Sequence, residues 1–296
     1  MVAAAHVNAE GAGVESALSS SAIDQRHTVP VLELNGVSIH YEVHGSGPPL
    51  LMLHGLGGSC ADWIFQVPAF APYYRVVTPS LRGFGHSEKP RGSYSIEQHA
   101  SDAFALLDAL GIERCHVLGH SMGGAITFEM ALEQPQRVAS LVVLNSQPSF
   151  ELDSLRKRAM LVWRLILPRL LGMPRMARLM GERYFPDPDQ ASVREHVVKR
   201  HSGNDARAYI ANLRALAGWS VVDRLGEIRA PVLLVTADQD FTAVEEKRRY
   251  LASLADARME VIPHSRHITH LDQPEAFNRV VLEFLSGVDQ GQTRRV

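Results

Sequence analysis

A serine at position 121 lies between two glycines in residues 119–123, which read Gly-His-Ser-Met-Gly. This G-x-S-x-G pattern follows an apolar segment and precedes a helical pattern, as a tight turn between a strand and a helix requires. Side chains two residues before or after the serine would collide in such a turn, which explains both glycines. The turn exposes the hydroxyl and directs the free N–H groups of the helix start at a reacting oxygen. We therefore expect Ser121 to be a nucleophile.

A serine hydroxyl reacts when a base accepts its proton, and a carboxylate orients that base. Both partners are expected later in the chain than the serine. The apolar segment 232–237 is followed by two candidate acids, Asp238 and Asp240, and Asp272 is a third. The candidate bases lie together after the apolar segment 259–262: His264, His267 and His270. The spacing alone does not choose among the acids or among the histidines.

A second glycine-rich turn, residues 54–58 (His-Gly-Leu-Gly-Gly), directly follows the apolar segment 50–53. Because glycines carry no side chain, backbone N–H groups in such a turn can converge on one point. The N–H groups of Leu56 and Met122 would then form an oxyanion hole, which stabilises the charge on a tetrahedral intermediate. The four elements together predict nucleophilic catalysis by a serine.

Short apolar segments alternate with helical patterns along most of the chain. The Asn35-Gly36 pair predicts a tight hairpin between the first two strands. The alternation predicts an α/β fold, with a mostly parallel central sheet and helices on both of its faces. The expected strands are 31–34, 37–43, 50–53, 75–78, 115–119, 138–145, 232–237 and 259–262, and the clearest helices are 95–110 and 123–133.

Residues 147–219 interrupt this alternation, because they are helical in pattern and contain no strand-like segment. Basic and apolar residues are interleaved over 154–183, where Glu182 is the only acid. We interpret 147–219 as an inserted helical cap with an apolar face on the core and a solvated basic face. The alternative is that the basic face contacts a lipid surface.

The chain is therefore expected to divide into a core, a cap and two tails. Residues 1–27 are rich in Ala, Ser and Gly and lack the apolar run of a secretory signal. The predicted parts are a flexible tail at 1–27, an α/β core at 28–146 and 220–288, the cap at 147–219 and a C-terminal tail at 289–296.

The composition excludes several classes of function. Across 296 residues, 30 Lys+Arg and 32 Asp+Glu give a formal charge of −2, so there is no overall basic field to hold nucleic acid. Cys60 and Cys115 are expected to be free thiols, which favours the cytoplasm. No dinucleotide or Walker pattern predicts a cofactor, and the closely spaced histidines lack the H-E-x-x-H pattern of a metal site. The sequence does not indicate an oligomeric state.

Several of these motifs resemble those of the α/β-hydrolase superfamily. The resemblance extends from about residue 29 to residue 287, and it implies that Asp240 is the acid, that His267 is the base, and that the cap lies between strands six and seven. Ser80 and Arg266 depart from the family pattern, which commonly has Asp and Gly there. The motifs are 54–58, 82–87 (Arg-Gly-Phe-Gly-His-Ser), 119–124, 237–240 (Ala-Asp-Gln-Asp), and His267 with 273–277 (Gln-Pro-Glu-Ala-Phe).

The residue at the turn narrows the activity that the resemblance implies. Dehalogenases and epoxide hydrolases of the superfamily have an aspartate where this chain has Ser121, and carbon–carbon bond hydrolases often have Asn where it has His120. The resemblance implies a cofactor-free serine hydrolase that cleaves a small, hydrophobic carboxylic ester through an acyl-serine. The alternatives are a lactone, enol-lactone or C–C bond hydrolase, an acyltransferase or perhydrolase on the same triad, and a catalytically silent ligand-binding protein.

Overall fold

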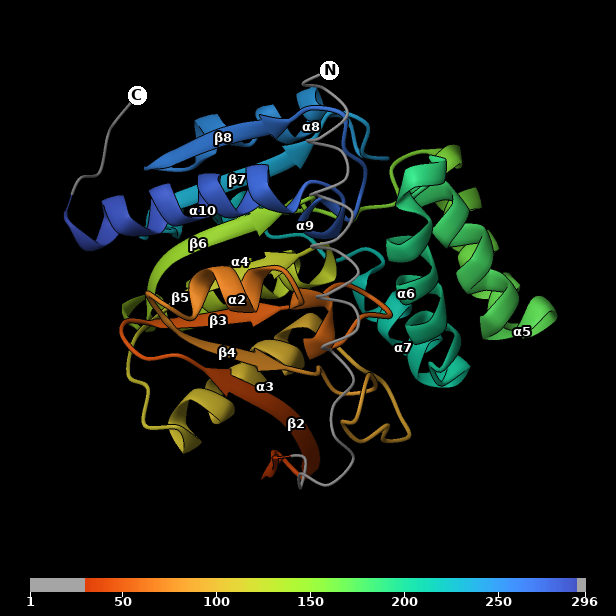
Figure 1. Ribbon diagram of the computed structural model, residues 1–296, viewed down its shortest axis with the longest axis horizontal. Helices are drawn as coiled ribbons and strands as arrows, with labels where there is room; N and C mark the ends of the chain where they lie inside the picture. The colour runs from red at the N-terminus through yellow and green to blue at the C-terminus, as the bar shows by residue number, and fades with distance from the viewer. Residues whose placement is uncertain (1–29, 292–296) are drawn as a thin grey trace, which may run out of the picture.

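The computed structural model describes residues 30–291, so the predicted N-terminal tail and most of the C-terminal one lie outside the described residues. Eight strands form one sheet in the order β1-β2-β4-β3-β5-β6-β7-β8 (Figure 1). The strands are β1 (Val31–Leu34), β2 (Val37–His44), β3 (Pro49–Leu53), β4 (Arg75–Pro79), β5 (Cys115–His120), β6 (Val138–Leu144), β7 (Val232–Ala237) and β8 (Ala257–Ile262).

The sheet is antiparallel at one end and parallel elsewhere. β1 and β2 form the hairpin predicted from Asn35-Gly36, whose φ angles of 51° and 72° are the left-handed ones that a two-residue turn requires. β2 also pairs antiparallel with β4, and every later pair is parallel. The predicted α/β class with a mostly parallel sheet is confirmed.

Helices cover both faces of the sheet. In Figure 1, α2 and α10 lie in front of the strands, and α3 and α4 lie behind them. α3 begins after Ser95, whose side chain accepts the N–H of Gln98, as its capping pattern predicts. The helices of the core are α2 (Gln66–Phe70), α3 (Ile96–Ala109), α4 (Met122–Glu133), α8 (Val244–Arg248), α9 (Thr269–Asp272) and α10 (Pro274–Asp289).

Alternate residues of the parallel strands build two separate apolar cores. Leu50 and Met52 of β3 pack in the layer that contains Phe277 of α10. Their neighbours Leu51 and Leu53 belong to the opposite layer, with α3 and α4. Because side chains on a strand alternate between the two faces, both sides of the central strands are buried. The sheet is thereby a rigid platform for the loops at its ends.

The insertion between β6 and β7 forms a helical layer beyond the carboxyl ends of the parallel strands (Figure 1). Its helices are α5 (Leu155–Tyr184), α6 (Ala191–Ser202) and α7 (Ala206–Leu216). α5 is bent at Gly172, which has a φ of 73°. The insertion has a narrow stem, because Ser149 and Ser220 form an antiparallel bridge and Phe150 donates its N–H to the carbonyl of Trp219 at 2.7 Å.

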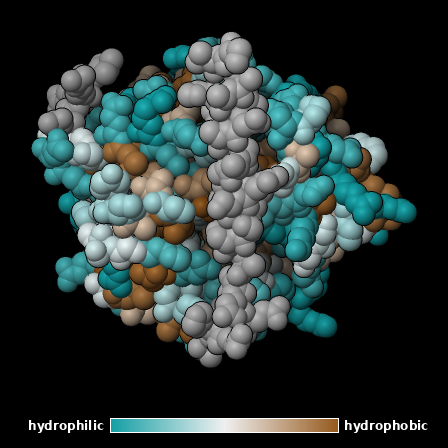
Figure 2. Space-filling view, viewed as in Figure 1, coloured by the Kyte–Doolittle hydropathy of each residue, from teal (hydrophilic) through white to brown (hydrophobic). Residues whose placement is uncertain are grey.

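The outer side of α5 mixes apolar and basic residues. Leu155, Trp163 and Leu170 are 83%, 62% and 74% exposed. Figure 2 shows hydrophobic residues scattered among hydrophilic ones at the right-hand edge, where α5 lies. Within residues 30–291, no helix combines the length and apolar character needed to cross a bilayer.

Candidate active site

Ser121 occupies the sharp turn between β5 and α4. Its φ of 53° and ψ of −113° lie outside the helical and extended regions, so the backbone is strained there. A Cβ on Gly119 would lie 2.2 Å from the carbonyl oxygen of Gly123, and a Cβ on Gly123 would lie 2.1 Å from that of Leu53. Both distances are too short for any contact, so only glycine fits on either side of the serine.

Three side chains from separate loops form a continuous hydrogen-bonded chain at the carboxyl end of the sheet. The Oγ of Ser121 lies 3.0 Å from Nε2 of His267, and Nδ1 of His267 lies 2.8 Å from Oδ1 of Asp240. Asp240 follows β7, and His267 follows β8. All three side chains are almost fully buried. This order of contacts is the one that a nucleophile, a base and an orienting acid require.

The two competing acids have structural partners instead. Asp238 accepts the backbone N–H groups of His264 and Ser265, both at 3.0 Å. Asp272 accepts the N–H of Arg266 at 2.8 Å. Both carboxylates therefore hold the loop that carries the histidine, and of the three candidates only Asp240 bonds to the imidazole itself.

The two competing histidines lie elsewhere. His264 is exposed and has a left-handed φ of 54°. His270 is buried with its ring centroid 4.7 Å from that of Trp63, and burial lowers its pKa to about 4. Of the three candidate bases, only His267 bonds to the hydroxyl of Ser121.

The glycine turn 54–58 lies beside the serine. Leu56 and Ser121 line the same two pockets. His54 holds the turn, because its Nδ1 lies 2.8 Å from the carbonyl oxygen of Gly55 and its Nε2 accepts the N–H of Leu81 at 2.9 Å. Met122 is the first residue of α4, where an N–H has no acceptor within the helix. The use of these N–H groups as an oxyanion hole stays a prediction.

Comparisons with known proteins identify the family of the chain. A family model described as the alpha/beta hydrolase fold matches residues 48–172. The protein named carbamate hydrolase RutD from Variovorax paradoxus is 33% identical over 260 residues, which are 84% of this chain and 97% of that protein. The chain belongs to the α/β-hydrolase family.

Two enol-lactonases are also similar to this chain. The 3-oxoadipate enol-lactonase 2 of Acinetobacter baylyi is 30% identical over 86% of this chain and 96% of its own. The crystal structure of an enol-lactonase from Burkholderia xenovorans LB400 has a TM-score of 0.81 at 26% identity, over 87% of this chain and 100% of that one.

In this α/β-hydrolase, a buried lysine extends the hydrogen-bonded chain beyond Asp240. The Nζ of Lys247 on α8 donates to Oδ2 of Asp240 and to Oγ1 of Thr236, each at 2.6 Å. Burial by itself raises the pKa of Asp240, but His267 and Lys247 together hold that pKa well below its ordinary value. Burial also lowers the pKa of Lys247, and the carboxylate of Asp240 opposes this shift. Asp240 is therefore ionised, with a hydrogen-bonded partner on each oxygen.

The backbone of the loop that carries His267 is held by two buried side chains. The Nδ2 of Asn145 donates to the carbonyl oxygen of His267 at 2.9 Å, and Nε2 of His120 lies 2.8 Å from the same oxygen. Burial lowers the pKa of His120 well below its ordinary value, so this ring is neutral and donates through Nε2. The Oδ1 of Asn145 accepts the N–H of Ala237. The side-chain amide of Asn145 thus connects the end of β7 to the loop after β8.

Lys247 and Asn145 were not predicted from the sequence. Lys247 belongs to the charged run 245–249, which is typical of an exposed helix, and only its spacing after Asp240 could have indicated a buried partner. Asn145 was assigned to the end of a strand, although its left-handed φ of 44° marks it as a turn residue.

The two departures from the family pattern leave the triad intact. The guanidinium of Arg266 lies 3.5 Å from a carboxylate oxygen of Asp187, on the insertion. Ser80 is buried, and its Oγ accepts the N–H of Cys60 at 3.4 Å and lies 3.3 Å from Nδ1 of His40. Neither side chain hydrogen-bonds to His267.

One group of side chains within residues 30–291 has the composition of a metal site. The ligand atoms of His40, Glu42 and Cys60 lie within 4.8 Å of one another. The Cys60 thiol donates to Glu42, and burial raises its pKa to about 12. The cluster is therefore satisfied by its own hydrogen bonds, and none of its members belongs to the triad.

Proposed function

We propose that this α/β-hydrolase cleaves a carboxylic ester through an acyl-serine intermediate. The observation that carries the proposal is the unbroken hydrogen-bonded chain from Ser121 through His267 to Asp240. Each member has the neighbour that its role needs, and the strained turn at Ser121 gives a pure binding protein no advantage.

In the proposed mechanism, His267 takes the proton of Ser121 as the hydroxyl oxygen attacks the substrate carbonyl. Asp240 stabilises the imidazolium that forms. The N–H groups of Leu56 and Met122 bind the oxyanion of the tetrahedral intermediate, and loss of one such donor typically costs about 2.7–4 kcal/mol of transition-state stabilisation. The intermediate collapses to an acyl-serine, and the alcohol leaves with a proton from His267. His267 then takes a proton from a water molecule as the water oxygen attacks the acyl carbonyl. The second tetrahedral intermediate breaks its bond to Ser121, which recovers a proton from His267 as the carboxylic acid leaves.

A lactone is the second candidate substrate. An internal ester requires the same attack on a carbonyl, and the leaving alcohol stays joined to the acyl group. The similarity to proteins named as enol-lactonases, at 30% identity and at a TM-score of 0.81, supports this alternative. Product analysis with esters, lactones and competing nucleophiles distinguishes these reactions.

The test is turnover of 4-nitrophenyl butyrate, together with labelling by a fluorophosphonate. We expect Ser121→Ala and His267→Ala each to lower kcat by about 10³-fold or more, and Ser121→Ala to abolish labelling. Asp240→Asn should be severe, whereas the matched Asp238→Asn should affect turnover little, because Asp238 contacts only the loop backbone.

Full activity in Ser121→Ala would refute the proposal. A folded wild-type protein that neither takes the label nor hydrolyses any ester or lactone would support the alternative of a silent binding protein. Cys60 and Cys115 are buried free thiols, which supports the expected cytoplasmic location without testing it.

A further inference from the structure

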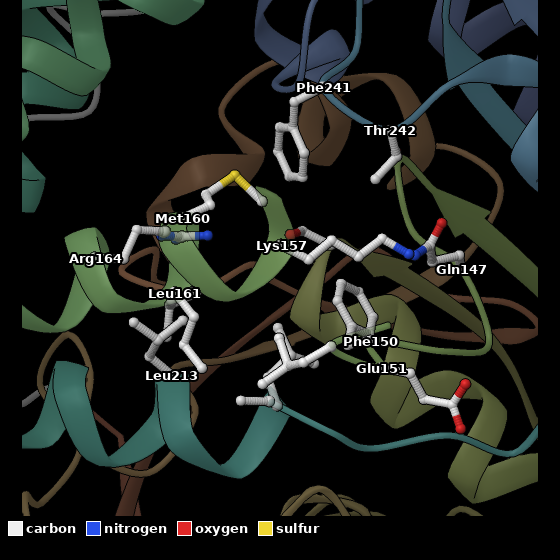
Figure 3. Close-up of a pocket in the computed structure, with 15 residues that line it drawn as sticks. Gln147, Phe150, Glu151, Lys157, Met160, Leu161, Arg164, Leu213, Phe241 and Thr242 are labelled. Atoms are coloured by element: carbon white, nitrogen blue, oxygen red, sulfur yellow. The ribbon is translucent and has the colours of Figure 1, made fainter. Parts of the chain in front are cut away.

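Arg164, on α5, stands where the cavities of the active-site region meet. An inner pocket is lined by Arg164, Ser121 and Phe241 (Figure 3). An outer cavity of about 480 Å³ shares Arg164 and Phe241 with it and is also lined by Trp163 and Met176. In Figure 3 the guanidinium of Arg164 is directed toward the interior of the inner pocket. Arg164 thus faces both the inner pocket, which contains Ser121, and the larger outer cavity.

The guanidinium of Arg164 is poorly satisfied by the protein. Nη2 donates to the hydroxyl of Tyr209 at 3.0 Å, but Nε is inaccessible to solvent and has no hydrogen-bond partner in the described part of the chain. No carboxylate of residues 30–291 forms an ion pair with this group. Among residues 30–291, its only hydrogen-bond partner is therefore the hydroxyl of Tyr209.

Three other basic groups near the site have acids as partners. The Nζ of Lys157 lies 3.0 Å from a carboxylate oxygen of Glu246, and the guanidinium of Arg200 lies 3.3 Å from that of Asp62. Lys247 has Asp240, as described above. A partly buried cation without a counter-ion loses hydration that nothing in the protein replaces. Arg164 differs from these three groups in this respect.

The walls around Arg164 favour an anion. The residues that line the outer cavity include Arg156 and Arg183 as well as Arg164, and none of them is an Asp or a Glu. The inner pocket has one acid in its lining, Glu151, whose carboxylate points away from Arg164 in Figure 3. The remaining walls are mostly apolar. The cavities therefore suit a molecule with a hydrocarbon body and a negatively charged end.

We propose that Arg164 binds a carboxylate of the substrate, so that the natural substrate is an ester or lactone that also carries a free acid group. The planar guanidinium matches a carboxylate in shape, and its Nη atoms carry the N–H donors at the end that is directed into the pocket. This inference rests on the proposed hydrolytic function, because the anion must lie in the same cavities as the carbonyl that Ser121 attacks.

The first test compares two methyl esters of equal chain length, methyl pentanoate and monomethyl glutarate, which differ only in a terminal methyl or carboxylate. We expect the wild-type protein to have the higher kcat/KM for the acid-bearing ester. Arg164→Gln should lower the ratio of the two kcat/KM values by about tenfold to a hundredfold, as expected for the loss of a hydrogen bond to a charged group. Arg164→Lys keeps the charge and should restore part of the ratio.

The matched control is Arg169→Gln, which removes an exposed arginine of the same helix that lines neither cavity. This variant should leave the ratio at its wild-type value. A ratio that is the same in the wild type and in a folded Arg164→Gln variant would overturn the inference, and Arg164 would then only anchor α5 to Tyr209 of α7.

A binding measurement separates this inference from the hydrolytic one. In Ser121→Ala, calorimetry should detect binding of monomethyl glutarate more strongly than of methyl pentanoate, and the added Arg164→Gln change should remove the difference. If the wild type takes no fluorophosphonate label and cleaves no ester or lactone but this preference is seen, the hydrolytic proposal fails and the anion site stands. If neutral esters are cleaved and no preference for the acid is found, the anion site fails alone.

Discussion

The charge of Lys247 should stabilise the folded protein, because it balances the buried charge of Asp240. Lys247 is the last member of the buried chain that runs through Asp240 to His267, with contacts of 2.6 and 2.8 Å on either side of the carboxylate. Its positive charge and its hydrogen bond both lower the pKa of Asp240. Replacement by Met removes both and leaves the buried carboxylate without its lysine partner.

The size of the effect follows from the burial of the pair. The side chains of Lys247 and Asp240 are 2% and 0% exposed. Removal of one partner of a buried ion pair leaves an uncompensated charge in the interior, so the free energy of unfolding of Lys247→Met at neutral pH should be about 3–5 kcal/mol below that of the wild type.

The assay is unfolding in urea at neutral pH. Lys247→Gln keeps a hydrogen-bond donor without the charge, so it should lose less stability than Lys247→Met. Arg248→Met is the control, because Arg248 is exposed on the same helix and forms only an exposed ion pair, whose loss costs little. Equal urea midpoints for Lys247→Met and Arg248→Met would refute the electrostatic argument.

Two further predictions concern folding. Gly123→Ala should destabilise the protein by about 3 kcal/mol, at the upper end for overpacking, whereas Gly226→Ala should be nearly neutral because nothing lies within 4 Å of its added Cβ. Equal urea midpoints for the two variants would contradict this steric reasoning. Because burial lowers the pKa of His270 to about 4, the unfolded chain binds more protons between pH 4 and 6.5, and the free energy of unfolding should fall as the pH drops through that range. In His270→Asn the slope should decrease by about 1.4 kcal/mol per pH unit, and an unchanged slope would show that His270 does not titrate there.

The parts of the fold that the sequence predicted are those fixed by local geometry. Asn35-Gly36 determines a turn whatever surrounds it, and residues 119–123 permit only one kind of bend. The short apolar segments were also found, because strands buried on both faces leave a continuous apolar run. These signals lie within a few residues of one another, so a single sequence shows them.

The choice among acids and histidines could not be made in this way. Asp238 and Asp240 lie two residues apart after the same strand, and only the folded loop shows that Asp238 binds backbone N–H groups whereas Asp240 faces the imidazole. Lys247 was missed for a related reason, since a lysine in a charged run is usually solvated. Burial of a charge depends on packing between distant segments, which residue spacing does not record.

The narrow stem at Ser149 and Ser220 has a consequence for how this enzyme can diversify. Because the chain leaves the sheet and returns to it at neighbouring points, a foreign helical segment needs only two ends about 5 Å apart to take the place of α5 to α7. Such an exchange would cut no strand and would leave the loops of the triad in place. Under the proposal that Arg164 of this insertion binds the substrate, part of substrate recognition lies on a stretch of the chain that can be replaced separately from the triad, and exchange of the insertion becomes a route to new specificities.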